Sequence, residues 1–572
     1  MATEENQNRN RRVIIVKKKP KTGIDRFDEY VQKSGLEPKN YQREGVEFCL
    51  RRERRGHVAA PILGGIIADE MGLGKTIVMM GLILANLAAF RRTLIVVPVA
   101  LIAQWVAQIK KTIIDTGVKS DLTVFVYHGS TGKRRVILSD GGDGIVWCHR
   151  PPKRGGGDGG SARAIDIVIT TYGCVAMEEP AEKAAPKVAP KAAPKAPTLS
   201  LLTFHADRVI FDEAHHLRNK SSRVFKGAMR VVGSGSGGRH PSVWIVTGTP
   251  IQNKISDLKS LCYVLGFGVG DLITEEKRKM IRDQYVLRRT KVSVGMVAGT
   301  DAAVAAAVAV DDVTCAPRLQ SLAHYKSNVA WTSENELDLS REIHRAAKNT
   351  TDRAERLKLY TRMRQMCVLP ALLRRGGGDG GDDVTHGLSA DEFHIAVSNQ
   401  SKMDQVVDRM MAEVGGVGGD GRKSIVFCHF RREMTKLRDM LLRSGVVAEE
   451  DNVAIIDGTV GARERARIFT AAPKVLILQI RTCSEGLNLQ EYSDVYFVSP
   501  HWNPCVEDQA IARCYRMGQT SQVRVFRFYM TDFVGEIDAV IPGESECIST
   551  LDHKCEEIQE RKRVLCNEFL MG

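Results

Sequence analysis

The 572-residue sequence contains no C-x-x-C pair, although thirteen cysteines are scattered along its length. A zinc ribbon, a RING insertion and a dithiol redox site all need closely spaced cysteines, so the spacing argues against each of them. Cysteines within apolar runs such as "IVFCHF" (425–430) are typical of reduced core residues in an intracellular protein. We therefore expect no zinc.

The sequence also lacks a long hydrophobic run. Its N-terminus, "MATEENQNRNRR", has no apolar stretch of the kind that a signal peptide needs. The longest bland apolar run, "AAVAAAVAV" (302–310), is far shorter than the roughly 20 residues of a membrane-spanning helix. We expect a soluble protein that is neither secreted nor inserted in a membrane.

Positive charge is present in excess. The net charge of +14 favours an anionic partner such as nucleic acid. Many soluble proteins are mildly basic, so charge alone does not decide the partner. The run "VKKKPK" (16–21) is either a nuclear-import signal or part of a solvated tail, and we expect a basic disordered tail over residues 1–33.

The chain is too long for one hydrophobic core, so two or more domains are expected. Two glycine-rich near copies (153–160 and 374–381) and a Pro/Ala/Lys run (181–198) predict flexible surface segments. We place flexible insertions near 150–162 and 178–199.

Short apolar runs rich in Val and Ile alternate with longer helical patterns, as buried parallel strands and their connecting helices should. The strand-like runs of the first half are "TLIVVPV" (93–99), "IDIVITTY" (165–172), "RVIFDEA" (208–214) and "VWIVTGT" (243–249). A second set follows over 423–530: "KSIVFCHF", "VAIIDG", "KVLILQI", "VYFVSP" and "VRVFRFYM". The sequence therefore predicts an α/β fold with two domains built on parallel sheets.

The division of the chain follows these runs. We expect a first lobe over 34–292, a linker or helical insertion over 293–400, a second lobe over 401–540 and a C-terminal helix over 541–572. The apolar residues of that helix recur at near-helical spacing, which predicts packing against a lobe; a partner helix is the alternative.

The stretch "ADEMGLGKT" (68–76) resembles a phosphate-binding loop between a strand and a helix. In such a loop Lys75 would reach the β- and γ-phosphates and Thr76 would bind Mg²⁺. The general pattern has a glycine where this sequence has Asp69. A capped helix start with an exposed lysine is the alternative.

A second acidic motif, "VIFDEAHH" (209–216), puts two carboxylates at the end of a predicted strand. Asp212 would hold Mg²⁺ and Glu213 could polarise the water that attacks the γ-phosphate. An isolated acidic pair is usually a solvated strand end. Both motifs in one chain, in this order, favour a nucleotide site.

Together the motifs resemble those of Swi/Snf-type DNA translocases of helicase superfamily 2. The similar stretches, from about Leu36 to Met530, are "NYQREGVEFC" (40–49), "ADEMGLGKT", "DEAH", "TGTPIQN" (247–253), "VLRRTK" (286–291), "SKMDQVVDRM" (401–410), "IVFCHF", "IIDGTV", "SEGLNLQ" (484–490), "HWNPCVEDQAIARCYRMGQT" (501–520) and "VRVFRF". "HLRNKSS" and "HWNPCVEDQ" are most similar to the post-replication-repair branch, which usually carries a RING.

The resemblance implies two RecA-like lobes with an ATP cleft between them, and ATP and Mg²⁺ as cofactors. Gln42 would contact adenine. The phosphate and metal site would consist of Asp69, Gly72, Gly74, Lys75, Thr76, Asp212 and Glu213. Thr247, Thr249 and Gln252 would couple the ATP state to lobe closure, while Gln509, Arg513 and Arg516 would approach the γ-phosphate. Spaced three apart, the two arginines are expected on one face of a helix. Ala512, Tyr515 and Glu485 depart from the family pattern, and we expect them to tune activity.

The resemblance also implies double-stranded DNA held across both lobes by its phosphates, without sequence preference. On lobe one the expected contacts lie in "PVALIAQW" (98–105) and "TTYG" (170–173), with Thr170 and Thr171. On lobe two they lie in "HFRREM" (429–434) and "SEGLNL", with Arg431 and Asn488. A true strand-separating helicase and a DNA-binding scaffold without ATPase activity stay open as alternatives. The expected location is the nucleus, or a viral compartment if the chain comes from a large DNA virus.

Overall fold

The fold is given by a computed structural model that describes residues 21–54, 62–118, 122–128, 136–138, 146–147, 165–178, 200–235, 240–272, 274–296, 319–373, 390–414, 421–447, 449–483, 488–533 and 549–571. The glycine-rich segments, the Pro/Ala/Lys run and residues 484–487 of "SEGLNL" lie outside these ranges. None of the helices within them is long and apolar enough to cross a membrane.

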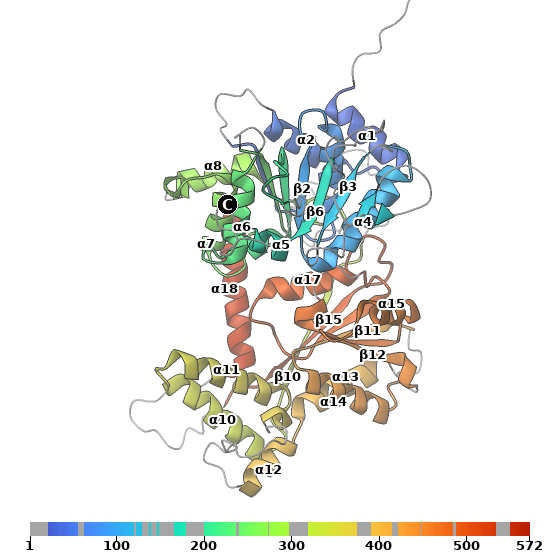
Figure 1. The fold of residues 1–572 in the computed structure, drawn as a ribbon. Helices are drawn as coiled ribbons and strands as arrows, with labels where there is room; N and C mark the ends of the chain where they lie inside the picture. The colour runs from blue at the N-terminus through green and yellow to red at the C-terminus, as the bar shows by residue number, and fades with distance from the viewer. Residues whose placement is uncertain are drawn as a thin grey trace, which may run out of the picture.

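The first lobe is built on a nine-stranded sheet with the order β5-β4-β3-β6-β2-β7-β8-β1-β9 (Figure 1). Its strands are β1 (Gly64–Ile67), β2 (Thr93–Val97), β3 (Val124–Tyr127), β4 (Val136–Leu138), β5 (Val146–Trp147), β6 (Ile167–Thr171), β7 (Arg208–Asp212), β8 (Ser242–Val246) and β9 (Val286–Leu287). Its helices are α1 (Gly23–Lys33), α2 (Asn40–Glu53), α3 (Lys75–Ala85), α4 (Ile102–Ile109), α5 (Tyr172–Met177), α6 (Arg223–Gly233), α7 (Ile255–Leu265) and α8 (Glu275–Tyr285).

The central strands of this sheet run parallel and are buried along their whole length. β2 pairs in parallel with β6 and β7, and β7 pairs in parallel with β8. One face packs on the apolar sides of α1–α4, the other on α5–α7. Continuous Val/Ile runs suit strands covered on both faces, so the predicted α/β architecture is confirmed. The antiparallel pairing of β4 with β3 and β5 was not predicted.

The second lobe has a six-stranded parallel sheet with the order β10-β15-β14-β11-β13-β12. Its strands are β10 (Ala323–Val329), β11 (Lys423–Cys428), β12 (Val453–Ile456), β13 (Val475–Gln479), β14 (Tyr492–Phe497) and β15 (Arg524–Met530). Its helices are α10 (Glu334–Asn349), α11 (Arg353–Val368), α12 (Ala390–Ser398), α13 (Ser401–Val414), α14 (Arg431–Arg443), α15 (Ala462–Ala471), α16 (Ile480–Cys483) and α17 (Pro504–Cys514). The edge strand β10 comes from the stretch interpreted above as a linker.

The N-terminal segment differs from the predicted disordered tail, because residues 23–33 form helix α1. Thr22 closes a capping box with Asp25 at the start of this helix. Phe27, Tyr30 and Val31 are buried against α3 in the core of the first lobe. Apolar residues three and four apart on one face fold this segment onto the lobe.

The C-terminal helix α18 (Leu551–Met571) joins the two lobes (Figure 1). Leu551 and Cys555 belong to the apolar core of the second lobe, whereas Phe569 belongs to a core of the first. Between these ends, Gln559 donates to the His501 backbone carbonyl at 2.6 Å. The helix therefore packs on the protein itself, as predicted.

Candidate functional site

The predicted phosphate loop lies between β1 and α3, in the expected strand–turn–helix order. Gly72 and Gly74 both have positive φ, at 91° and 77°, and Gly74 is the N-cap of α3. Only glycine adopts this backbone conformation without strain. Lys75, the first residue of α3, donates from Nζ to the backbone carbonyls of Asp69 and Glu70 at 2.9 and 3.3 Å. The loop thus holds the lysine ammonium against its own backbone.

Gln42, the predicted adenine contact, lies on α2 directly against this loop. Its Nε2 donates to the Leu73 carbonyl at 3.2 Å, and its side chain is buried. A Cβ on Gly74 would lie 2.5 Å from the same Nε2. The left-handed backbone at position 74 favours glycine, and any larger residue there would also have to displace the Gln42 amide.

We predict that Gly74→Ala raises the KM for ATP about tenfold, because it combines a left-handed backbone cost with a clash against Gln42. Gly35→Ala is the matched control: Gly35 also has a positive φ of 65°, and nothing lies within 4 Å of its Cβ position. Steady-state kinetics with thermal unfolding separate the two effects. An unchanged KM in Gly74→Ala would contradict the assignment of this loop.

Asp69 has a partner that was not predicted. Both of its carboxylate oxygens bind Arg289, and the Asp69 side chain is 1% exposed. Arg289 also donates to the Tyr41 carbonyl in α2. In the described structure the Asp69 carboxylate therefore holds the loop to Arg289, and its contact with a cofactor stays a prediction.

The two carboxylates of "DEAH" stand where β7 ends. Asp212 is the last residue of β7, and its Oδ1 accepts from the Glu213 backbone N at 3.0 Å. Glu213 has a positive φ of 49°, an uncommon conformation that turns the chain sharply. Its Oε2 lies 3.4 Å from Nδ1 of His215.

Lys75, Asp212 and Glu213 lie close enough for the charge of each to act on the pKa of the others. Burial lowers the pKa of Lys75, although Glu213, Asp69 and Asp212 oppose that shift. Burial, followed by the charge of Glu213, raises the pKa of Asp212. Burial also disfavours ionised Glu213, but His215, Lys75 and Arg513 outweigh it and lower its pKa. The contribution of Arg513 shows that the second lobe acts on this cluster.

Arg513 lies in α17, and Arg516 lies just after the end of that helix. The helix ends at Cys514 with Tyr515 as its C-cap, so the prediction of both arginines on one helical face is wrong. Arg516 lies over the phosphate loop: a Cβ on Gly72 would be 3.5 Å from the Arg516 Cβ. Burial and the neighbouring Arg513 lower the pKa of Arg516. The second arginine therefore meets the loop from beyond the end of the helix.

The predicted coupling residues form a hydrogen-bonded chain that ends on α17. The Thr249 backbone N donates to Thr247 Oγ1 at 3.2 Å, and Gln252 Nε2 donates to Thr249 Oγ1 at 3.3 Å. Gln252 Oε1 accepts from Asn503 Nδ2 at 3.3 Å. Asn503 is the N-cap of α17, so this chain connects lobe one to the helix that carries Gln509 and Arg513.

A cavity of about 600 Å³ adjoins this contact and is lined by both lobes and α18. On its wall, Lys291 pairs with Glu70 at 2.8 Å and lies 4.7 Å from the Tyr515 ring centroid. Arg289 and Lys291 belong to the motif "VLRRTK", and Asn503 belongs to "HWNP". The sequence predicted no role for these three residues. Their contacts come from segments far away in the chain.

The predicted DNA contacts differ in exposure. Thr170 is fully buried with Oγ1 donating to the Tyr127 carbonyl at 2.9 Å, and Thr171 is 2% exposed and caps α5. These two hydroxyls serve the fold of β6 and α5, which corrects their assignment as DNA contacts. Arg431 and Asn488 are exposed, and Arg431 pairs with Asp457 at 2.7 Å.

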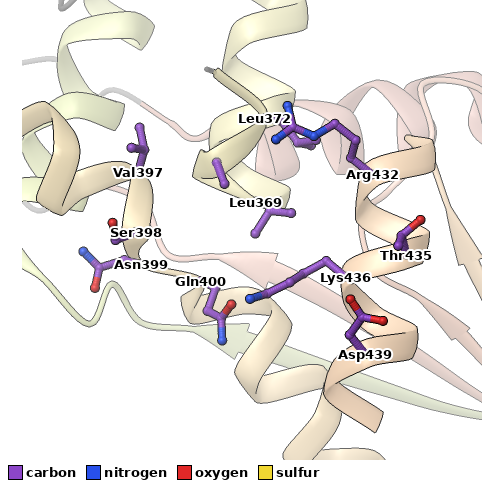
Figure 2. A pocket seen from close by; sticks show the side chains of 11 residues that line it. Leu369, Leu372, Val397, Ser398, Asn399, Gln400, Arg432, Thr435, Lys436 and Asp439 are labelled. Atoms are coloured by element: carbon purple, nitrogen blue, oxygen red, sulfur yellow. The ribbon is translucent and has the colours of Figure 1, made fainter. Parts of the chain in front are cut away.

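A second cavity, of about 460 Å³, lies on the second lobe and is lined in part by Arg432 of α14. Figure 2 shows Arg432 and Lys436 of α14 facing Leu369, Leu372 and the end of α12 across it. This cavity contains none of the predicted site residues.

Comparison with known proteins gives two family matches. Residues 41–292 match the SNF2-related domain, and residues 402–518 match the helicase conserved C-terminal domain. The chain is 25% identical over 517 residues to the "Probable global transactivator" of Orgyia pseudotsugata multicapsid polyhedrosis virus, covering 86% of each.

Cellular relatives are longer than this chain. It is 26% identical over 541 residues to the "Chromodomain-helicase-DNA-binding protein 9" of Mus musculus, covering 88% of the chain and 16% of that protein. It is 23% identical over 682 residues to the "DNA repair protein RAD5" of Gibberella zeae, covering 88% of the chain and 56% of that protein. The chain thus spans less than two thirds of either cellular relative.

Proposed function

Because the chain belongs to the Swi/Snf-type family of DNA-dependent ATPases, we propose that it couples ATP hydrolysis to movement along duplex DNA. The observation that carries the proposal is that charged groups of the two lobes lie near one another around the phosphate loop. Lys75, Asp212 and Glu213 come from lobe one, and Arg513 and Arg516 come from lobe two. A motor of this kind converts closure of two lobes into a step.

The phosphate loop and the groups around it favour a nucleoside triphosphate as the ligand. Two positive-φ glycines give the loop the tight backbone turn that a phosphate-binding loop needs. Gln509 Nε2 is buried and makes no hydrogen bond within the described part of the chain, so it is a donor available to a ligand. When bound, Mg²⁺ would neutralise phosphate charge at Thr76 and Asp212.

Each residue then has a defined task in the proposed reaction. Lys75 would bind the phosphates, and Glu213 would orient the attacking water and accept its proton. Arg513 and Arg516 would stabilise the charge that develops on the transferred group, which happens only when the lobes are closed. The Thr247–Gln252–Asn503 chain would transmit that closure.

DNA would bind through its phosphates. The net charge of +14 and the exposed Arg431 and Asn488 support a sequence-independent contact. The proposal includes remodelling of protein–DNA complexes in chromatin, repair or transcription, within the nucleus or a viral compartment.

ATP hydrolysis measured with and without duplex DNA tests the proposal. We expect DNA to raise kcat, and DNA affinity to fall steeply with salt because counterions are released on binding. Displacement of a third strand from a triplex, without separation of the duplex itself, would indicate translocation. Efficient duplex separation would favour the helicase alternative, and hydrolysis unaffected by DNA would refute the proposal.

A further inference from the structure

Lys291, the last residue of "VLRRTK", is a buried cation that is held against the phosphate loop. Its ammonium pairs with Glu70 Oε1 at 2.8 Å, and its backbone N donates to Glu70 Oε2 at 2.7 Å. Only 4% of Lys291 is exposed. Burial opposes ionisation of Glu70, but Lys291 and Arg288 outweigh it and lower the pKa of this carboxyl. The charge-assisted bond and the backbone bond together fix the lysine to the loop.

The same ammonium faces an aromatic ring of lobe two. Its Nζ lies 4.7 Å from the ring centroid of Tyr515, within the range of a cation–π contact. Tyr515 is 5% exposed, and such contacts are stronger where water is excluded. Burial and, after it, the charge of Glu70 raise the pKa of Tyr515 to about 12. Glu70, Lys291 and Tyr515 therefore form one contact that connects the phosphate loop to the end of α17.

Gly72 of the phosphate loop meets both Lys291 and Arg516. A Cβ at Gly72 would lie 3.5 Å from Lys291 Cε and 3.5 Å from Arg516 Cβ. The stem of the lysine and the start of the arginine side chain therefore pack on the same glycine. Tyr515 is the C-cap of α17, and Arg516 is the next residue. The ring that Lys291 contacts thus belongs to the residue directly before the arginine.

We propose that Lys291 and Tyr515 are positioning residues, which hold the end of α17 against the phosphate loop and so place Arg516 over Gly72. The inference rests on the proposed function and deepens it, because Lys291 had no predicted role and Tyr515 departs from the family pattern. Both residues act through Arg516 and not on the reacting atoms. Misplacement of a catalytic group by about 1 Å can lower a rate by about 10²-fold, so a contact of this kind affects turnover.

Lys291→Met and Tyr515→Leu test this role, because the first removes the cation and the second removes the ring. We expect each to lower the DNA-stimulated kcat about tenfold, while the Kd for a fluorescent ATP analogue stays near the parental value. Loss of the ammonium does not leave Glu70 buried without a partner: its side chain is 33% exposed and accepts from the Lys291 backbone N. Tyr515→Phe keeps the ring and should retain parental kcat.

A double-mutant cycle with Arg516→Ala separates positioning from general support of the fold. If Tyr515 acts through Arg516, Tyr515→Leu should change kcat little in the Arg516→Ala background. If the tyrosine only stabilised the lobe contact, the two losses would multiply. Single-turnover hydrolysis measures the slow variants, and multiplied losses would overturn the proposal.

Lys326 provides a control with similar contacts away from the phosphate loop. Its ammonium pairs with Glu556 at 2.7 Å and lies 4.7 Å from the ring centroid of Tyr529. These three residues belong to β10, α18 and β15. The Lys326 side chain is 48% exposed, so Lys326→Met should cost little stability and should retain parental kcat. Thermal unfolding of every variant shows whether a lower kcat reflects a folding defect.

The outcomes distinguish this proposal from the proposed function. Parental kcat in both Lys291→Met and Tyr515→Leu, in a parent that duplex DNA stimulates, would overturn the positioning role alone. A parent without DNA stimulation would overturn the proposed function and the inference that rests on it. If Tyr515→Leu fails to fold, Lys291→Met keeps the test decisive, because methionine retains an unbranched stem of nearly the same length.

Discussion

Arg516→Ala is expected to lower the DNA-stimulated kcat about 10³-fold or more, the range for an arginine supplied to a transferring phosphoryl group. The structure supports this because Arg516 lies over Gly72 of the phosphate loop. Its pKa is lowered by burial and by Arg513, so two cations are held together in a partly dry site. An anion between them relieves their repulsion, and Arg513→Ala should therefore have a similar effect.

ATPase kinetics on Arg516→Ala, Arg516→Lys and a surface control measure this effect. Arg467→Ala is the control, since Arg467 lies on α15 of the same lobe with its side chain 79% exposed. It should retain parental kcat. Arg516→Lys keeps the charge but loses the planar donor pair, so an intermediate rate is expected. If Arg516→Ala and Arg513→Ala both retained parental kcat, neither arginine would stabilise the transferred phosphoryl group.

Lys75→Ala is expected to weaken ATP binding and lower kcat by roughly 10²–10³-fold, as the loss of a preorganised charge at the reacting group implies. In the structure the Lys75 ammonium is held by the Asp69 and Glu70 carbonyls within the field of Glu213 and Asp212. Steady-state kinetics and equilibrium binding of a fluorescent ATP analogue report the two losses separately.

Glu213→Gln is expected to impair hydrolysis without impairing ATP binding, unlike Lys75→Ala. It should lower hydrolysis by roughly 10²–10⁴-fold, the range for a general base, while ATP binding stays near the parental value. Lys226→Ala controls for the loss of a surface charge, because Lys226 is an exposed lysine on α6.

Parental activity in Lys75→Ala would refute the assignment of the phosphate loop.

Much of the fold could be predicted because its signals are local. The apolar runs that became β2, β6, β7 and β8 are short and continuous, which is how parallel strands covered on both faces look in a sequence. The segments that escaped prediction carry weaker signals. β10 reads "AHYKSNV" and is largely exposed on its outer side, so only its pairing with β15 makes it a strand.

In the site, too, the residues of local motifs could be predicted, whereas contacts between distant segments could not. The motifs named Lys75, Asp212 and Arg513; in the structure the charges of Lys75 and Arg513 act on the acidic pair Asp212–Glu213. The catalytic roles of these residues stay predictions. The pairing of Asp69 with Arg289 was not predicted, because the two residues lie 220 residues apart in the chain. Motif spacing gave no sign that the end of β6 would bury the Thr170 hydroxyl.

By itself the sequence determined the class of fold, the order of its motifs and the backbone freedom of the phosphate loop, because propensity and periodicity act over a few residues. Tertiary structure alone decided which groups meet. Gln252 and Asn503 are 251 residues apart yet share a hydrogen bond, and Arg516 lies over Gly72 from beyond the end of α17. Such contacts depend on how two lobes and α18 pack together, which no local pattern encodes.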